Sequence, residues 1–226
     1  MNILEFLKTN EKYLEDFITR STYHSNAIEG STLTYAETYA ILFNDNSITI
    51  NNKEPREIYE AINHKKALEY LFAELNKETE LNDKLVKNIN QIINMNIKNS
   101  EGYRRTGVLI RGSEEIPPRP EEVNNLMLYF FDDYKNSNED LFYKLADFHI
   151  RFESIHPFED GNGRTGRILI NYELLKNDTA PIVIAKEQRS EYFEYLRNKD
   201  TDGLKAFIEK LSKEEKERIE KLRNIK

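Results

Sequence analysis

The sequence predicts an all-α fold that carries one small β-hairpin. Apolar residues recur at helical spacing through most of the chain, and polar or Pro/Gly-containing segments separate one such run from the next. The best strand candidate is the short apolar run Val108–Ile110, which lies between Gly107 and Gly112. No internal repeat, low-complexity linker or strong domain boundary interrupts this pattern, so we expect a single domain.

The first helices are marked by apolar spacing and by capping residues. Apolar residues at helical spacing predict a helix over about 3–20. Thr34, with Glu37 three residues later, has the capping-box pattern and predicts a helix that runs to about Phe43. Pro55 suits the first turn of a long helix, because that turn leaves its N–H groups unbonded. Further helices are expected at about 55–75, 83–97, 121–136, 140–155, 164–177, 187–198 and 202–224.

The composition indicates a soluble globular protein and argues against several classes of partner. The 226 residues are enough for one substantial core, with 38% hydrophobic and 32% charged residues. A net charge of −7 argues against a nucleic acid or an anionic membrane as the partner. The sequence has no cysteine, no apolar run of membrane-spanning length and no signal-peptide pattern at its start. We therefore expect a cytoplasmic protein without disulfide bonds.

The run from His156 to Arg167 contains the residues with the clearest chemistry. Pro157 and the glycines exclude a regular helix before Arg164, and the apolar run at 168–170 predicts a buried helix after it. A glycine-rich loop at a helix N-terminus gathers backbone N–H groups and the positive end of the helix dipole, which together bind phosphate. The alternative is an ordinary Gly/Asn turn with surface arginines, but the complete ordered set favours phosphate chemistry.

Each polar side chain of this run has its own candidate role. Arg164 and Arg167 lie one turn apart and can bind further phosphate oxygens. Asp160 offers a hard oxygen ligand, which suits a magnesium ion shared with phosphates. His156 is the group whose ordinary pKa lies near neutrality, which makes it the natural general base. The run therefore predicts nucleotide phosphate chemistry with a base that can deprotonate an acceptor.

The same residues resemble, without a departure, the signature of the Fic family, H-P-F-x-(D/E)-G-N-G-R-x-x-R. The resemblance implies an all-α enzyme that transfers AMP from ATP to a hydroxyl side chain of a target protein. It assigns His156 as the base and Asp160 as the ligand of the Mg2+ ion that bridges the α- and β-phosphates. Gly163 favours adenylyl transfer over the Doc-like kinases, which typically carry lysine there. The implied nucleotide-binding residues are Phe158, Gly161, Asn162, Gly163, Arg164, Arg167 and Tyr192.

A second segment, Ser25–Gly30, has two interpretations. Alone, Glu29 is a helix-end carboxylate and Gly30 is a residue that ends the helix. In a Fic protein the segment resembles the inhibitory motif (S/T)-x-x-x-E-(G/N), here in an N-terminal helix near 22–30. The resemblance implies that Glu29 pairs with Arg167, which denies the γ-phosphate of ATP its partner. Some relatives also use this glutamate to position a water that removes AMP from a target.

The predicted strand at Val108–Ile110 also has two interpretations. It is either a minor hairpin on a helical core or a flap whose free edge binds an extended target segment as an added strand. The segment from Gly102 to Ile110 resembles the Fic flap, which favours the second interpretation. A target bound there would place its hydroxyl residue over His156. The residues expected to dock the target are Val108, Leu109, Ile110, Arg111 and Gly112.

Together these features predict a single Fic domain over residues 1–226, with N-terminal helices over 1–52, a catalytic core over 53–210 and a charged helix over 211–226. The expected activity is autoinhibited protein adenylyl transfer from ATP with release of pyrophosphate and with Mg2+ as the metal. The target would present a Ser, Thr or Tyr hydroxyl, and self-modification or a homodimer is compatible with the sequence. Two alternatives stay open: net removal of AMP by Glu29, and a non-catalytic nucleotide-binding module.

Overall fold

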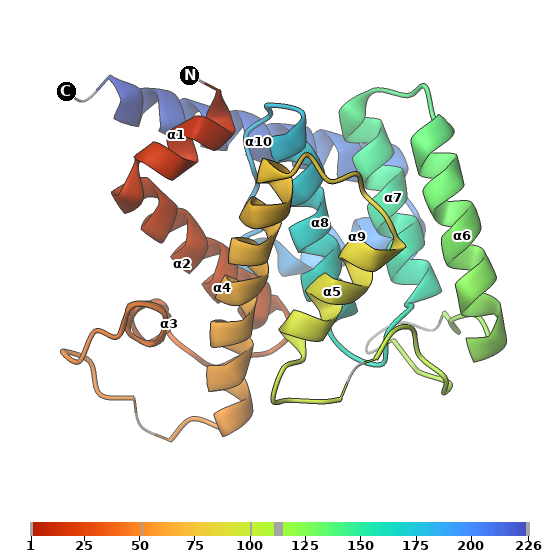
Figure 1. The fold of residues 1–226 in the computed structure, drawn as a ribbon, viewed down its shortest axis with the longest axis horizontal. Helices are drawn as coiled ribbons and strands as arrows, with labels where there is room; N and C mark the ends of the chain where they lie inside the picture. Colours follow the sequence, from red (N-terminus) through yellow and green to blue (C-terminus); the bar gives the residue numbers. More distant parts are fainter. Residues whose placement is uncertain (1, 51, 100, 111–114, 225–226) are drawn as a thin grey trace.

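The computed structural model describes residues 2–50, 52–99, 101–110 and 115–224. These residues form helices and connecting segments without a β-strand, which confirms the predicted all-α class (Figure 1). No helix in this part of the chain combines the length and apolar character that crossing a bilayer requires. The helices are α1 (Ile3–Thr9), α2 (Glu11–Ile28), α3 (Tyr35–Phe43), α4 (Pro55–Asn76), α5 (Asp83–Ile93), α6 (Pro120–Asn136), α7 (Leu141–Ile155), α8 (Asn162–Lys176), α9 (Arg189–Asn198) and α10 (Thr201–Arg223), with a short 3-10 helix at Lys186–Gln188.

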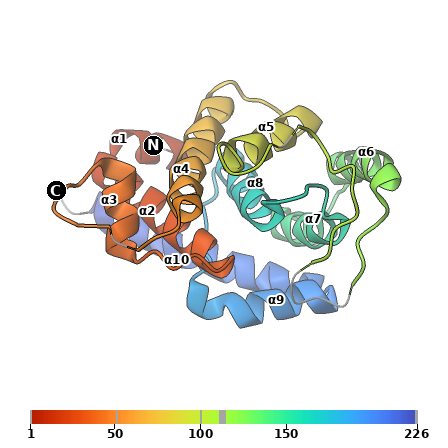
Figure 2. The same cartoon turned by 90° about the horizontal axis from the view of Figure 1, so that it is seen from below.

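Helix α8 is the central helix of the fold. Figures 1 and 2 show it surrounded by its neighbours, and it packs against α7, α4, α5, α1 and α2. Almost every side chain from Asn162 to Leu175 is buried, including the polar Asn171 and Glu173. A helix enclosed in this way is held on all sides, so its first turn is a rigid support for the residues that precede it.

Two clusters of buried apolar side chains lie against α8. One contains Ile168 and Leu169 and joins α8 to α1, α2, α4, α5 and α6. The other contains Ile170 and Leu174 and joins α8 to α7, α9 and α10. Helix α10 packs along α7, and α6 covers the outer side of α7. The apolar spacing that predicted the helices is therefore the spacing that builds these two clusters.

Three predicted helix boundaries are wrong. The helix predicted over 3–20 is two helices, because Asn10 ends α1 and its side chain accepts a hydrogen bond from the Tyr13 N–H to begin α2. The helix predicted over 83–97 ends at Ile93, and turns follow it. The central helix begins at Asn162 rather than Arg164, since Gly163 adopts helical geometry despite its low helix propensity.

The predicted β-hairpin is absent from the described residues. Val108, Leu109 and Ile110 form an irregular segment, and Arg111 and Gly112 lie outside the described part of the chain. Leu109 is 85% exposed, so a run of apolar residues here does not mark a buried strand. An apolar run predicts a strand only where a neighbouring segment pairs with it, and no strand pairing occurs in the described residues.

Candidate active site

The site is built where α7 passes into α8. His156 caps the C-terminus of α7 in the left-handed region, with φ 49° and ψ 60°. Non-glycine residues adopt this conformation infrequently, and the end of a helix is a common place for it. The turn directs the chain from α7 into the loop that leads to the first turn of α8. It therefore places the imidazole next to the N-terminus of the central helix.

The loop before α8 is closed by Asn162 and supported by α5. The Asn162 side chain accepts a hydrogen bond from the Phe158 N–H and donates one to the Phe158 carbonyl, both at 2.9 Å. Asn90 on α5 and Asn94, the residue that caps the C-terminus of α5, each donate a side-chain hydrogen bond to the Asp160 carbonyl. Gly161 has φ +77°, and a Cβ there would meet α5 at 2.8 Å. The loop is therefore rigid before any ligand enters.

The first turn of α8 presents N–H groups that the helix itself does not bond. The N–H groups of Asn162, Gly163 and Arg164 lie in this turn, at the positive end of the helix dipole. These three residues and Gly161 also line one cleft together with His156. An anion in the cleft can therefore meet several backbone donors at once, as the sequence predicted.

Arg164 is buried in a cluster of charged side chains at the cleft. Its guanidinium lies 3.2 Å from Glu60 Oε1 on α4 and 3.0 Å from Asp160 Oδ1. Arg56, also on α4, contacts the second oxygen of Asp160. Burial alone would raise the pKa of Asp160, but the nearby Arg164 and Arg56 hold it below the ordinary value. Asp160 is therefore an ionised carboxylate at neutral pH.

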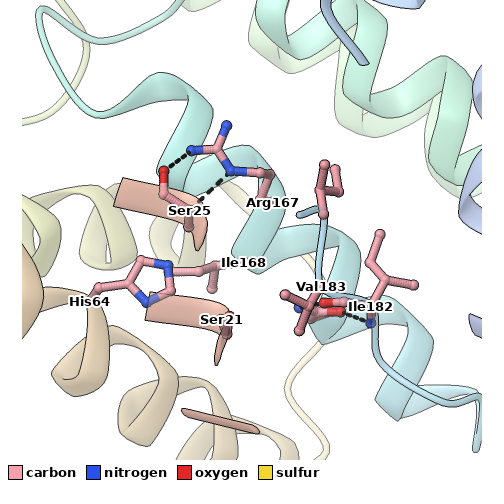
Figure 3. Close-up of a pocket in the computed structure, with 9 residues that line it drawn as sticks. Ser21, Ser25, His64, Arg167, Ile168, Ile182 and Val183 are labelled. Atoms are coloured by element: carbon pink, nitrogen blue, oxygen red, sulfur yellow. Dashed lines mark hydrogen bonds between the residues drawn. The ribbon is translucent and has the colours of Figure 1, made fainter. Parts of the chain in front are cut away.

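Arg167 is held by α2, the helix that contains Ser25. Its Nε donates to Ser25 Oγ and its Nη2 donates to the Ser25 carbonyl, both at 3.0 Å (Figure 3). The same Nη2 donates to Glu29 Oε1 at 2.7 Å. Glu29 is the C-cap of α2, and Gly30 follows it with φ +106°. The helix therefore ends as the sequence predicted, and its terminal carboxylate pairs with Arg167.

Figure 3 also shows a small pocket behind this contact. Ser25 and Arg167 line one side of it, and His64 of α4 lines another. Burial lowers the pKa of His64 to about 3, so this histidine is neutral, and it shares a hydrogen bond with Thr22. His64 is therefore a neutral core histidine behind the site, and its second ring nitrogen, Nε2, is buried without a hydrogen-bond partner among the described residues.

His156 faces the cleft as a neutral imidazole. Burial lowers its pKa, and a hydrogen bond from Nδ1 to the Glu153 carbonyl, 3.3 Å away, opposes this effect. That carbonyl can only accept, so Nδ1 carries the proton and Nε2 has the free lone pair. The arrangement leaves Nε2 able to accept a proton from a hydroxyl group in the cleft.

Two of the predicted nucleotide-binding residues lie in different surroundings. Tyr192 lines the cleft and is buried, with its hydroxyl 2.6 Å from His149 Nε2. Its ring also lies 5.9 Å from the Arg167 guanidinium. Phe158, in contrast, is 1% exposed and packs against Tyr103 in the core behind the loop. The Phe158 side chain therefore supports the loop from behind and does not line the cleft.

The segment predicted as a flap borders the same cleft. Leu109 and Ile110 line it together with His156. Arg104 fixes the start of this segment: its backbone N–H donates to the Pro157 carbonyl, and its Nε donates to the His156 carbonyl, both at 2.8 Å. The flap segment and the loop that begins at His156 are therefore joined through one buried arginine.

The structure thus brings five predicted site residues to one cleft. Four of them, His156, Asp160, Arg164 and Arg167, follow one another along the sequence, whereas Glu29 is far from them in sequence. The sequence analysis did not identify the residues that support them. These are Arg56 and Glu60 on α4, Asn90 on α5 and Asn94 at its C-terminal cap, and Arg104. Only the unusual abundance of asparagine at helical spacing in α5 was a visible signal.

The structure is thus a helical domain that presents a histidine and a glycine-rich helix N-terminus to one cleft. Residues 80–174 match the Fic/DOC family. The chain belongs to this family, which the sequence signature indicated.

Similar proteins agree with this assignment. The chain is 32% identical over 192 residues to a protein adenylyltransferase Fic of Drosophila willistoni and 31% identical to one of Nematostella vectensis. Each match covers 82% of this chain but only 38% and 44% of the relatives, so the chain spans about two fifths of their length. A Fic domain containing signalling protein from Bacteroides thetaiotaomicron has a TM-score of 0.77 at 27% identity, covering 92% of this chain and 86% of its own. Fic-1 from C. elegans has a TM-score of 0.76 at 28% identity, covering 96% and 64%.

Proposed function

We propose that this chain is a protein adenylyltransferase that transfers AMP from ATP to a hydroxyl side chain of a target protein. The observation that carries the proposal is the position of His156, a neutral base in the same cleft as the N–H groups of the first turn of α8. The relatives named protein adenylyltransferase Fic support the direction of the chemistry. A pure nucleotide binder would need the N–H groups but not the base.

The reaction follows from these two features. His156 Nε2 accepts the proton of the target hydroxyl, whose oxygen forms a bond to the α-phosphorus of ATP. The bond between the α-phosphorus and its bridging oxygen breaks, and pyrophosphate leaves with that electron pair. Backbone N–H groups of Asn162 and Gly163 stabilise the negative charge on the phosphates, together with Arg164.

Magnesium is the metal that the family implies. No cluster of three or more His, Cys, Asp or Glu side chains that could hold a metal occurs in the described residues. A magnesium ion does not need one, since it is commonly held by one carboxylate, substrate phosphates and water. Asp160 is ionised, lines the cleft and lies beside the phosphate-binding turn, so it fits this ligand role. The bound metal would supply charge neutralisation at the phosphates.

We also propose that Glu29 inhibits the transfer. Its carboxylate occupies Arg167, which would otherwise bind the γ-phosphate, and it places a negative charge at that position. Gly163 is consistent with this role, because a Cβ at that residue would lie 2.4 Å from Glu29 Oε1. A side chain at residue 163 would therefore displace the Glu29 carboxylate from its present position beside Arg167.

The deciding experiment is intact-mass spectrometry of a Glu29→Gly protein incubated with ATP and magnesium. We expect the protein itself to gain the mass of one or more AMP groups. A Glu29→Gly, His156→Ala protein is the control and is expected to gain none. Absence of an adduct on the Glu29→Gly protein and on every protein of a cell extract would contradict the proposal.

A second candidate is net removal of AMP from a modified target. The observation that favours it is that the Glu29 side chain is 37% exposed in the cleft although Oε1 is paired with Arg167. A carboxylate in that position can orient a water molecule toward an adenylylated side chain. Incubating a purified adenylylated target with wild-type protein distinguishes the two, because only this function releases free AMP.

We further propose that the segment at Val108, Leu109 and Ile110 docks the target. It borders the cleft beside His156, and Leu109 presents an exposed apolar side chain. An extended target segment laid along this backbone would bring a hydroxyl residue over the base. Crosslinking from a photoreactive residue at position 109 to a modified target would test this placement.

A further inference from the structure

Glu153 is a carboxyl group in the cleft to which the transfer chemistry assigns no role. It lies in the last turn of α7, one turn before His156. It lines the same cleft as Glu29 and Arg167, and its side chain is 15% exposed. Its carboxyl is close enough to Glu29 and Arg167 for both charges to shift its pKa.

One oxygen of the Glu153 carboxyl, Oε1, has no hydrogen-bond donor among the described residues. This oxygen is buried, and it lies 4.0 Å from His149 Nε2. Oε2 lies 3.9 Å from His156 Nδ1. Both histidines already use these nitrogens, His149 with Tyr192 and His156 with the Glu153 carbonyl. A buried carboxylate without donors is costly, so the geometry favours the neutral acid.

The charges around Glu153 act in the same direction. Burial raises its pKa, the Glu29 carboxylate raises it further and Arg167 opposes both, so that the pKa is about 8. Two ionised carboxylates beside one arginine would repel each other. The neutral form of Glu153 thus allows Glu29 to occupy Arg167 without this repulsion.

We propose that Glu153 serves the anion site as a neutral carboxylic acid: while protonated it admits an anionic group at Arg167, and once ionised it repels that group. The anionic group is the Glu29 carboxylate in the inhibited protein and the γ-phosphate of ATP in the released one. The inference rests on the proposed ATP site. It predicts that nucleotide binding weakens at alkaline pH through one titrating side chain.

The groups that face Glu153 from the surrounding helices do not titrate in the same range. Burial lowers the pKa of His149 on α7 to about 3, and the pKa of His156 is also below its ordinary value. The pKa of Tyr192 on α9 is raised by burial, and that of Arg167 on α8 is raised by Glu29 although burial opposes it. Removal of Glu29 by mutation takes away one of the two causes that raise the pKa of Glu153, so in the Glu29→Gly protein Glu153 titrates at a lower pH than in the wild type.

The test measures binding of α,β-methylene-ATP, which cannot donate AMP, by calorimetry from pH 6.5 to pH 9.5. The Glu29→Gly protein is compared with the Glu29→Gly, Glu153→Gln protein. In the Glu29→Gly protein, the affinity should fall as pH rises from the pKa of Glu153 in the nucleotide-free protein to its pKa in the nucleotide-bound protein. The fall is at most tenfold for each pH unit in this interval, and we expect about tenfold in total. The glutamine variant, which stays neutral, should lose less than twofold. Because both proteins bind the same nucleotide, titration of its phosphates changes both affinities equally and does not affect their ratio.

Glu173 is the matched control. It is a second glutamate whose pKa is raised by burial, but it accepts a hydrogen bond from Tyr134 and does not line the cleft. The Glu29→Gly, Glu173→Gln protein should keep the full pH dependence, and loss of that dependence would overturn the proposal. Equal pH dependence in the Glu153→Gln protein would also overturn it. No binding by Glu29→Gly at pH 7.0 would contradict the ATP site itself, which separates the two failures.

A second measurement tests the proposal without the Glu153→Gln substitution, in case that variant does not fold. The carboxyl carbon of Glu153 can be followed by 13C NMR in the Glu29→Gly protein during a pH titration. Binding of α,β-methylene-ATP should raise the pKa of Glu153 by about one unit, which corresponds to the tenfold change in affinity. An unchanged pKa on binding would overturn the proposal.

Discussion

The Glu29 carboxylate accepts a 2.7 Å hydrogen bond from Arg167, across 138 residues of sequence. Ser25, one turn earlier on α2, accepts two more hydrogen bonds from the same guanidinium. One helix end thus satisfies most of the donors of an arginine that α8 directs into the cleft. A phosphate can take this place only if the end of α2 moves or Glu29 rotates away, so the contact couples the position of α2 to the anion site.

Glu29→Gly is expected to raise adenylyl transfer at least about tenfold. A charge-assisted hydrogen bond contributes ~1.5–3 kcal/mol, and the 37% exposure of Glu29 places this pair at the lower end. An energy of ~1.4 kcal/mol already corresponds to a tenfold change in the fraction of free sites. The initial rate of AMP incorporation from labelled ATP measures this change. Release of the negative charge should enlarge it.

The matched variant is Glu29→Gln, which keeps the shape of the side chain and removes its charge. It should recover part of the gain, whereas Arg167→Ala added to Glu29→Gly should cancel the gain. An unchanged rate in the Glu29→Gly protein would mean that Ser25–Gly30 is only a capped helix end. Modified target that accumulates in the mutant and is stripped by wild type would favour AMP removal instead.

His156→Ala in the Glu29→Gly background should lower transfer ~10²–10⁴-fold and leave ATP affinity within about twofold. Removal of the base affects proton transfer, while the N–H groups that bind phosphate stay in place. Because the pKa of His156 lies below its ordinary value, the imidazole is neutral at pH 7, and the rate should decline only below pH 6.5. Near-normal transfer by the double mutant would defeat the assignment of the base.

Asp160→Asn should weaken transfer and shift its magnesium dependence to higher concentration. The carboxylate is the candidate metal ligand, and an amide is a poorer ligand for a hard cation. A magnesium titration of the rate in the Glu29→Gly background gives the change. Asn90→Ala is a useful comparison, because it loosens the same loop through the Asp160 carbonyl without removing a carboxylate. A magnesium optimum that stays the same in Asp160→Asn would exclude Asp160 as the ligand.

The sequence was sufficient for those parts of the fold that depend on local signals. Thr34 and Glu37 form the predicted capping box, and α4 begins at Pro55 as expected. The break at Asn10 was missed because the apolar spacing continues across it, and only the side-chain cap marks the division. The strand at Val108–Ile110 was wrong because an apolar run beside a cleft can stay exposed, as Leu109 does.

In the candidate site, too, the residues that could be predicted are those whose roles depend on nearby sequence, and the residues that were missed depend on contacts distant in sequence. The residues of the loop from His156 to Arg167 could be predicted because their roles depend on order along one segment. Arg104 could not, since its hydrogen bonds to carbonyl groups more than 50 residues away depend on how the loops fold over each other. Glu153 gave no signal either, because an ordinary glutamate becomes unusual only through burial beside Glu29.

Arg104→Gln should destabilise the loop and raise the pKa of His156. The buried guanidinium donates to the carbonyls of His156 and Thr106, and leaving such acceptors unpaired costs about 1–3 kcal/mol for each group. The positive charge of Arg104 also lowers the pKa of His156, so its removal should let that pKa rise. Thermal unfolding and an NMR titration of the imidazole test the two effects. Arg104→Lys keeps the positive charge but not the guanidinium hydrogen bonds. In this variant the pKa of His156 should therefore stay close to its wild-type value, while the protein should still be less stable than wild type.

Glu153→Gln should remove a pH-dependent loss of stability from the whole protein. The pKa of Glu153 is about 8 in the folded state and close to the ordinary 4.5 in the unfolded state. The folded state therefore binds more protons between these values, and the free energy of unfolding falls as pH rises through this window. One pKa unit corresponds to 1.36 kcal/mol, so the loss between pH 5.5 and pH 8 is at most about 3 kcal/mol. Urea unfolding at both pH values should show a smaller loss for Glu153→Gln than for wild type. An identical loss in the two proteins would mean that Glu153 is ionised in the folded state throughout this range.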